Sequence, residues 1–96
     1  MASSKEYRDY ILELLDLNED ISYKPMMGEY LLYYRGVLFG GIYDDRFLVK
    51  KVSHNSKYKM IEVIPYNNAK SMYFVDSEDS ELLRDIVKDT YKDLKS

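Results

Sequence analysis

Three β-rich runs between residues 30 and 50, separated by two-residue breaks, constrain the fold of this chain most strongly. The first break is Arg35-Gly36 and the second is Asp44-Asp45. Glycine adopts positive φ without strain and aspartate tolerates turn conformations, so both pairs are typical of tight turns. The pattern predicts an antiparallel meander with strands at 30–34, 37–43 and 46–50.

Glycines mark special backbone positions within and beside this meander. Gly40-Gly41 in mid-strand predicts a β-bulge, or a helix that crosses close to the sheet. Gly36 closes a two-residue turn, and Gly28 follows two methionines at a strand junction. We expect both of these glycines to adopt conformations that other residues take only with strain.

Amphipathic helices are predicted at both ends of the chain. Apolar residues recur at helical spacing from about residue 4 to residue 17, after a capping box formed by Ser3 and Glu6. Asp79 and Glu81 favour the start of the last helix, because acidic side chains interact well with a helix N-terminus. Its predicted apolar face consists of Leu82, Leu83, Ile86, Val87, Tyr91 and Leu94.

The segments between these elements are less regular. Residues 21–24 alternate as a short strand, which Pro25 either places at a sheet edge or ends. Residues 53–61 fit a short helix, whereas residues 60–64 fit a strand, and the pattern leaves both alternatives open. A turn at 67–70 followed by β-rich residues 72–75 predicts another hairpin.

Together these elements predict one two-layer α+β domain over residues 1–96, in the order α-β-β-β-β-(α)-β-β-α. The two terminal helices should cover one face of an antiparallel sheet, since each must bury its apolar stripe. A chain of 96 residues is long enough to bury one core without covalent staples.

Composition excludes several classes of protein. The chain has no cysteine, which excludes disulfides, thiolate zinc sites, iron–sulfur clusters and thiol nucleophiles. No apolar run approaches the roughly 18 residues that a membrane span needs. The first residues contain no apolar stretch of signal-peptide length, so a cytoplasmic location is expected.

Charge is unevenly distributed along the chain. The net charge is −3, made up of −4 for residues 1–20, +4 for residues 21–75 and −3 for residues 76–96. The overall sign disfavours a domain that binds nucleic acid mainly through phosphates. The basic centre still contains a candidate patch with an aromatic residue inside it, formed by Lys50, Lys51, Lys57 and Lys59 around Tyr58.

No pattern in the sequence predicts catalysis, a metal or a cofactor. The Tyr-x-x-x-Lys pattern occurs at Tyr66 and Tyr91, but about one match is expected at random in a chain so rich in both residues. No glycine-rich phosphate turn accompanies either match. His54 is the only histidine and has no carboxylate within four residues. We therefore expect a protein that is not an enzyme.

Tyrosine is the most over-represented residue, with 11 in 96 and no tryptophan. Neighbouring strand residues point to opposite faces, so some of these rings must lie outside the layer that the helices cover. Tyrosine is common at interfaces because its ring is apolar and its tip is polar. The predicted assembly is a homodimer through the tyrosine-bearing sheet surface or edge, and a monomer with a half-exposed sheet is the alternative. The strand tyrosines are Tyr23, Tyr30, Tyr33, Tyr34, Tyr43 and Tyr73.

The central third of the chain resembles the N-terminal domain of TfoX (Sxy), the regulator of competence genes. The motifs that carry the resemblance are Met26-Met27-Gly28-Glu29-Tyr30, Gly36-Val37-Leu38-Phe39 and Asp44-Asp45-Arg46-Phe47-Leu48-Val49-Lys50. The family has a Met-Phe-Gly-Gly segment, a Gly-Val-Met-Phe strand and an Asp-Asp-x-x-Tyr-x-Lys segment at these places. The resemblance implies an α+β fold that often dimerises, a role in regulation and protein interaction, and no known catalytic residues.

Three functions are compatible with these observations. The first is a non-enzymatic regulatory or protein-interaction domain linked to competence or transcription, with Met26, Met27, Gly28, Tyr30 and Arg46 as candidate interaction residues. The second is a nucleic-acid-binding accessory protein that uses the run from Lys50 to Lys59. The third is a small-molecule binder built around residues 26–28 and 44–46.

Overall fold

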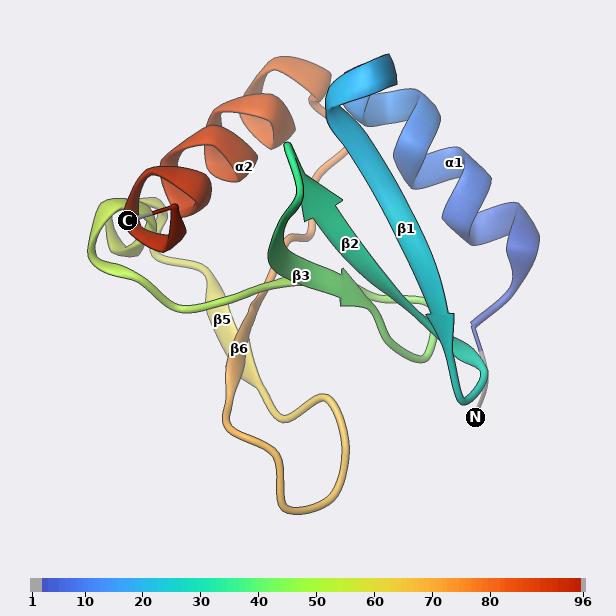
Figure 1. The fold of residues 1–96 in the computed structure, drawn as a ribbon. Helices are drawn as coiled ribbons and strands as arrows, with labels where there is room; N and C mark the ends of the chain where they lie inside the picture. Colours follow the sequence, from blue (N-terminus) through green and yellow to red (C-terminus); the bar gives the residue numbers. More distant parts are fainter. Residues whose placement is uncertain (1–2, 96) are drawn as a thin grey trace.

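A computed structural model describes residues 3–95, in which two α-helices pack on one face of a six-stranded antiparallel sheet (Figure 1). The predicted α+β class and the predicted order of elements are confirmed. The helical segments are α1 (Lys5–Leu15), η1 (Asn18–Asp20), η2 (Ser53–Tyr58) and α2 (Ser80–Leu94). The strands are β1 (Ile21–Met26), β2 (Glu29–Tyr34), β3 (Val37–Ile42), β4 (Phe47–Val49), β5 (Ile61–Val63) and β6 (Met72–Phe74).

The strand order in the sheet is β1-β2-β3-β4-β6-β5, so the first four strands form a continuous antiparallel series. The predicted meander at its centre is confirmed. Its turns have the expected positive φ angles, 50° and 80° at Arg35 and Gly36, and 53° and 54° at Asp44 and Asp45. Gly28 also has positive φ, at 86°. Each pair matches the twist of the strands that it joins, which favours tight hairpins.

A β-bulge interrupts the pairing of β2 with β3. The register shifts between Leu32, which pairs with Gly40, and Tyr33, which pairs with Leu38, and this leaves Phe39 as the extra residue. A Cβ atom on Gly40 would lie 2.2 Å from the carbonyl oxygen of Leu48. The glycine therefore allows a close approach of the β4 backbone, and the predicted β-bulge is confirmed at this point.

The N-terminus of α1 differs by one residue from the predicted capping box. Ser4 is the N-cap, and its hydroxyl accepts a hydrogen bond of 3.1 Å from the backbone N–H of Tyr7. The hydroxyl of Ser3 instead donates to the carboxylate of Glu29 at 2.6 Å. A contact between residues so distant in sequence has no signature in the local pattern.

Both alternatives for residues 51–64 are present in part. The 3-10 helix η2 occupies the first half of the segment, and the short strand β5 follows it. β5 pairs with β6, and the two are joined by a long loop, residues 64–71. Pro25 lies within β1 at one edge of the sheet, where a residue without an N–H is tolerated.

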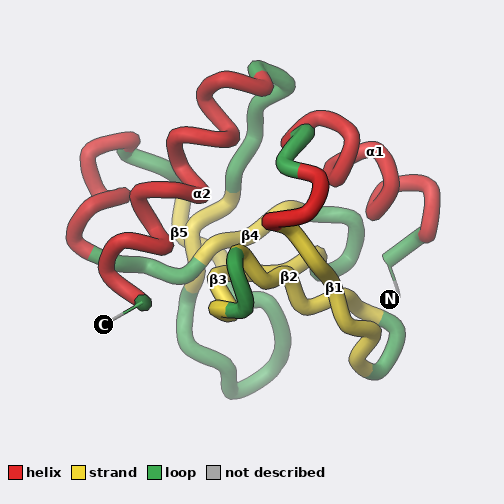
Figure 2. The backbone as a smooth tube through the Cα atoms, turned by 45° about the horizontal axis from the view of Figure 1, so that its top comes forward, coloured by secondary structure: helices red, strands yellow, loops and turns green. Residues whose placement is uncertain are grey.

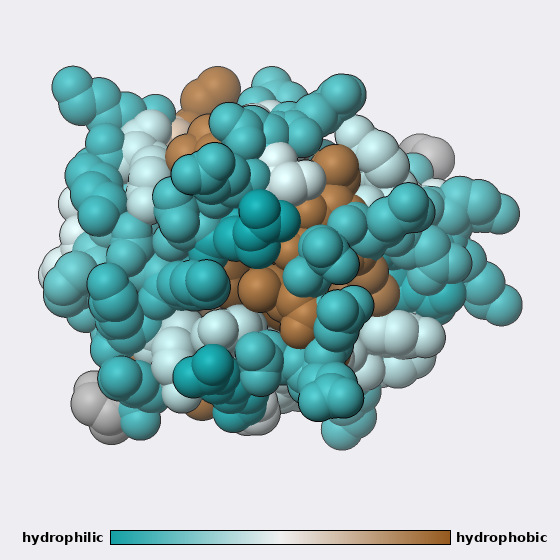
Figure 3. Space-filling model, turned by 90° about the horizontal axis from the view of Figure 1, so that it is seen from above, coloured by the Kyte–Doolittle hydropathy of each residue, from teal (hydrophilic) through white to brown (hydrophobic). Residues whose placement is uncertain are grey.

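The core lies between the sheet and the two helices (Figures 1 and 2). Ile11 and Leu15 of α1 and Leu83, Ile86 and Val87 of α2 are buried there. They pack on buried residues of the sheet, namely Tyr30, Leu32, Tyr34, Phe39, Ile42, Phe47, Val49 and Val75. Seen from the helix side, apolar side chains reach the surface in a central strip surrounded by polar residues (Figure 3).

Candidate ligand-binding groove

The face of the sheet turned away from the helices, here called the open face, carries a different set of side chains. In β2, Tyr30, Leu32 and Tyr34 are buried in the core, whereas the residues between them are only half-buried. Alternation therefore places Leu31 and Tyr33 on the open face. In Figure 1 the loop of residues 64–71 extends from this side of the sheet, away from the helices.

A second group of buried apolar residues lies outside the main core. Leu48, Tyr43 and Pro65 are buried although they are absent from the main core. A Cβ atom on Gly41 would lie 2.7 Å from the ring of Tyr43, so the glycine leaves the space that the ring occupies. The rings of Tyr43 and Tyr66 are 6.0 Å apart, which joins the end of β3 to the loop.

Next to this cluster the open face holds a groove with a volume of about 860 Å³. This volume is within the range of small-molecule binding sites. Its lining combines apolar side chains, two tyrosines and three lysines. The lining residues are Met26, Leu31, Leu38, Gly40, Tyr43, Lys50, Lys51, Pro65, Tyr66, Ala69, Lys70, Ser71 and Met72.

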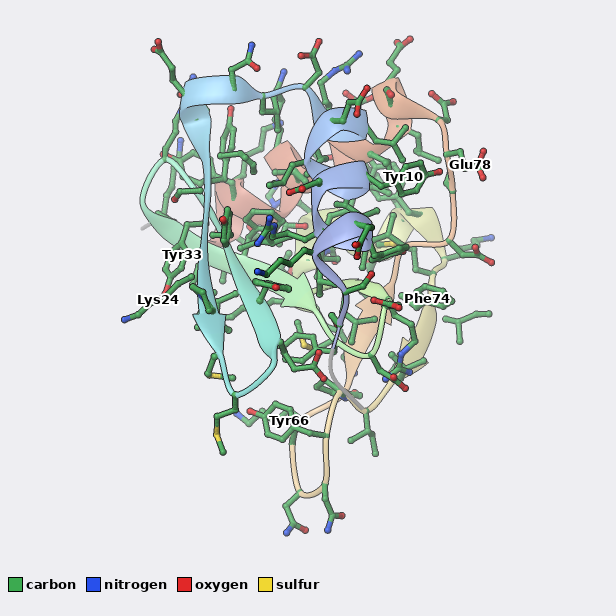
Figure 4. The ribbon with its side chains drawn as sticks, turned by 90° about the vertical axis from the view of Figure 1, so that its right-hand side faces the viewer. Tyr10, Lys24, Tyr33, Tyr66, Phe74 and Glu78 are labelled. Atoms are coloured by element: carbon green, nitrogen blue, oxygen red, sulfur yellow. The ribbon has the colours of Figure 1, made fainter. Side chains whose placement is uncertain are left out.

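Lys50 and Tyr43 mark two ends of the groove along β3, here called the lysine end and the tyrosine end. The backbone N–H of Lys50 donates to the carbonyl of Phe39 at 2.8 Å, which fixes Lys50 beside the first half of β3. Tyr43 follows the last residue of β3, and Met26 is the last residue of β1. Figure 4 shows Tyr66 on the loop that joins β5 to β6, and the centre of its ring lies 6.0 Å from that of Tyr43.

The three lysines differ in their partners. The ammonium of Lys51 donates to Glu62 at 2.6 Å and to Ser71 at 3.0 Å. The hydrogen bond to Glu62 is the largest cause that raises the pKa of Lys51. Within residues 3–95, neither Lys50 nor Lys70 forms an ion pair. These two cations are therefore available to an anion at this end of the groove.

A buried side chain behind the sheet holds the lysine end in place. Asn55 of η2 is fully buried, and its Nδ2 donates to the carbonyl of Lys50 and to the hydroxyl of Thr90, both at 2.8 Å. Its Oδ1 accepts from the backbone N–H of Val52 at 3.1 Å. Sequence reasoning missed this residue, because an asparagine in a polar segment carries no sign that it will be buried.

The five predicted interaction residues do not form one site. Met26 lines the groove, while Met27 is 98% exposed in the turn beside Gly28. Tyr30 points into the opposite layer, where the guanidinium of Arg8 lies 5.1 Å from the centre of its ring. The Nε of Arg46 donates to the carbonyl of Tyr43 at 3.3 Å, so Arg46 supports the turn that follows β3.

Ser3 and Glu29 tie the start of the chain to two turns of the sheet. Besides the hydroxyl of Ser3, the carboxylate of Glu29 accepts the backbone N–H of Ser3 and that of Asp44, both at 3.1 Å. Asp45 accepts from the backbone N–H of Ser4 at 2.8 Å. These acidic residues therefore have structural partners. Within residues 3–95, no cluster of histidine and acidic residues could hold a metal.

The predicted basic patch is divided between two parts of the molecule. Lys50 and Lys51 line the groove, whereas Lys57 forms an ion pair of 3.0 Å with Asp89 of α2. Lys59 is the C-cap of η2. The structure thus places Lys50 and Lys51 at the groove and Lys57 against α2.

His54 is exposed, as a solvated residue at a helix start should be, yet it has an acidic partner. Its Nδ1 lies 2.6 Å from Oδ1 of Asp93, and its backbone N–H donates to Oδ2 at 2.8 Å. This backbone hydrogen bond is the largest cause that lowers the pKa of Asp93. The pairing joins residues 39 positions apart, so searching near His54 in the sequence could not find it.

Comparison with family models, curated proteins and solved structures finds no match to this chain. Between residues 3 and 95, neither α-helix has the length and apolar character required to cross a membrane.

Proposed function

We propose that the protein is a non-enzymatic regulatory domain of the TfoX N-terminal type, which acts in the cytoplasm by binding another molecule in the groove on its open face. The observation that carries the proposal is the groove itself. It combines an apolar floor with a cationic end, and two of its lysines have no ion pair within the described chain. Sites of this kind orient a ligand by a few polar groups above an apolar surface.

The polar groups of the groove favour binding over chemistry. The pKa of Lys51 is raised by its hydrogen bond to Glu62, and burial raises the pKa of Tyr43. Both side chains are therefore protonated at neutral pH. They act as hydrogen-bond donors and not as nucleophiles or bases.

The resemblance to the TfoX N-terminal domain gives the proposal its regulatory part. Its motifs cover the strands and turns that build the groove, from Met26 in β1 to Lys50 after β4. The same resemblance supports a link to competence or transcription and interaction with a protein partner.

A test of regulation compares transcripts in the source organism after deletion of the gene and after replacement by groove variants. We expect Lys50→Glu with Lys70→Glu to alter the same transcripts as the deletion, because reversed charge at the groove abolishes binding of an anion. Lys88→Glu, on the exposed side of α2, is the matched control and should behave as the wild type.

Two outcomes would overturn the proposal. One is a deletion that leaves every transcript unchanged, and the other is a groove variant that acts as the wild type. Retention of DNA or RNA at low salt that is lost in the groove variant would favour the nucleic-acid-binding alternative instead.

A second candidate function, self-association, rests on the edge strand β5. Ile61 is 67% exposed and Ile64 is 60% exposed, and both lie at or beside this unpaired edge. An exposed apolar edge strand can pair with a second copy of the chain. Light scattering should give a mass near twice 11.4 kDa for a dimer, and Ile61→Lys should return it to the monomer mass. A wild-type monomer at micromolar concentration would exclude the dimer.

A further inference from the structure

We infer that the ligand of the groove is a small amphipathic anion, with an elongated apolar body and a terminal carboxylate or phosphate. The inference rests on the proposed function, because it names the class of molecule that the same groove binds. It follows from the arrangement of charge, apolar surface and closure along the groove.

The charged head group is assigned to the lysine end. Lys50 and Lys70 line the groove from neighbouring strands, one directly after β4 and one in the loop before β6. Lys51 also lines the groove, and its ammonium donates to Glu62 and Ser71. Three ammonium groups against one carboxylate leave a local excess of positive charge, which an anionic head group would neutralise.

The apolar body is assigned to the floor of the groove. Leu31, which pairs with Gly41, lies between the level of Lys50 and that of Tyr43 along β3, and Leu38 and Met72 line the groove near Lys50. Lys50 lies beside Phe39, four residues along β3 from Tyr43, which corresponds to about 13 Å at roughly 3.3 Å per strand residue. An extended ligand of that length would place its head at the lysines and its tail against Tyr43.

Closure of the tyrosine end favours a small molecule over a peptide. The centres of the Tyr43 and Tyr66 rings lie 6.0 Å apart, so this pair joins β3 to the loop at one end of the groove. A peptide that ran through the groove would have to pass this pair. A ligand with one polar end and one apolar end fits without displacing it.

Calorimetric titration of the full chain with decanoate, below its aggregation concentration, tests the inference. We expect saturable binding of decanoate and of decyl phosphate, and at least tenfold weaker binding of decylamine, which has the same chain and the opposite charge. Lys50→Glu with Lys70→Glu should weaken decanoate binding at least tenfold, whereas Lys88→Glu should leave it unchanged. Amide chemical shifts should change at residues of the groove, including Leu38 and Lys70.

Equal binding of decanoate and decylamine, or shift changes confined to α1 and α2, would overturn the inference. Thermal melting of each variant shows whether it is folded, and competition by salt on the wild type gives a second measure of the charge. A failure of all three probes, in a protein whose groove variants still alter transcripts, would leave the proposed function standing and reject this ligand class. Binding of an acidic peptide in place of decanoate would likewise reject it in favour of a protein partner.

Discussion

The two faces of the sheet differ in how they are covered, and this difference separates stability from function in the molecule. On the helix side, fully buried residues such as Leu32, Phe39 and Phe47 pack against α1 and α2. On the open face, a single loop packs on Tyr43 through Tyr66 and leaves a groove beside it. A protein interior is packed densely enough to exclude ligands, so binding requires a face that is only partly covered.

The largest difference in the free energy of unfolding is expected between alanine substitutions at two neighbouring residues of β3. Phe39 is fully buried on the helix side, with its ring 6.4 Å from that of Phe47, whereas Leu38 lines the groove. Phe39→Ala should lower the free energy of unfolding by about 3–5 kcal/mol, because it leaves a cavity in the core. Leu38→Ala should lower it by only about 1 kcal/mol, since its side chain is already half-exposed.

Urea denaturation of both variants measures this contrast. Similar losses of free energy in the two variants would show that the open face contributes as much to stability as the helix side. The groove would then be part of the core, contrary to the division between the two faces.

Two glycines, Gly40 in β3 and Gly36 in the turn before it, test how much the backbone of this region contributes to stability. Gly40→Ala would place a Cβ atom 2.2 Å from the carbonyl oxygen of Leu48, and should destabilise the protein by about 1–3 kcal/mol through overpacking. Gly36 has no atom within 4 Å of the added Cβ, but its φ is 80°. Gly36→Ala should therefore cost about 1 kcal/mol, through strain at positive φ alone.

Thermal unfolding should give a lower melting temperature for Gly40→Ala than for Gly36→Ala. Equal melting temperatures would mean that the β4 backbone can move away from Gly40. In that case the bulge is a flexible part of the sheet and does not fix the floor of the groove.

Most of the fold was predictable from local patterns, whereas most of the site was not. Helical spacing in residues 4–17 and the turn residues Arg35-Gly36 each determine the structure of a few neighbouring residues. Both predictions are confirmed. The exceptions are the helix boundaries and the N-cap, which is Ser4 and not Ser3. Of the groove, the sequence indicated Met26, Lys50 and Lys51. Leu31, Leu38 and Tyr66 meet them only through strand register and the course of a long loop, which no short-range pattern encodes.

The last comparison concerns two acidic residues, Asp89 of α2 on the helix side and Glu62 of the edge strand β5. Burial alone would raise the pKa of Asp89, but hydrogen bonds from Tyr58 at 2.6 Å and from Lys57 and Lys92 outweigh it and hold the pKa below its ordinary value. The partner Tyr58 has its pKa raised to about 12, through burial and then through Asp89. The hydrogen bond from Lys51 lowers the pKa of the exposed Glu62.

A carboxylate whose pKa is lowered in the folded state stabilises the protein above its unfolded pKa, near 3.9 for aspartate, and this contribution is lost as the pH falls through the folded value. Asp89→Asn should therefore be less stable than the wild type at pH 7 by about 1–2 kcal/mol, as for other buried hydrogen bonds to a charged group. This difference in the free energy of unfolding between Asp89→Asn and the wild type should close as the pH falls below about 3.9 and through the lowered pKa of Asp89. Glu62→Gln should have almost the same free energy of unfolding as the wild type at every pH, because water screens an exposed ion pair. Urea titrations at a series of pH values measure both differences. A difference for Glu62→Gln as large as that for Asp89→Asn would show that the groove rim is as well ordered as the contact between η2 and α2.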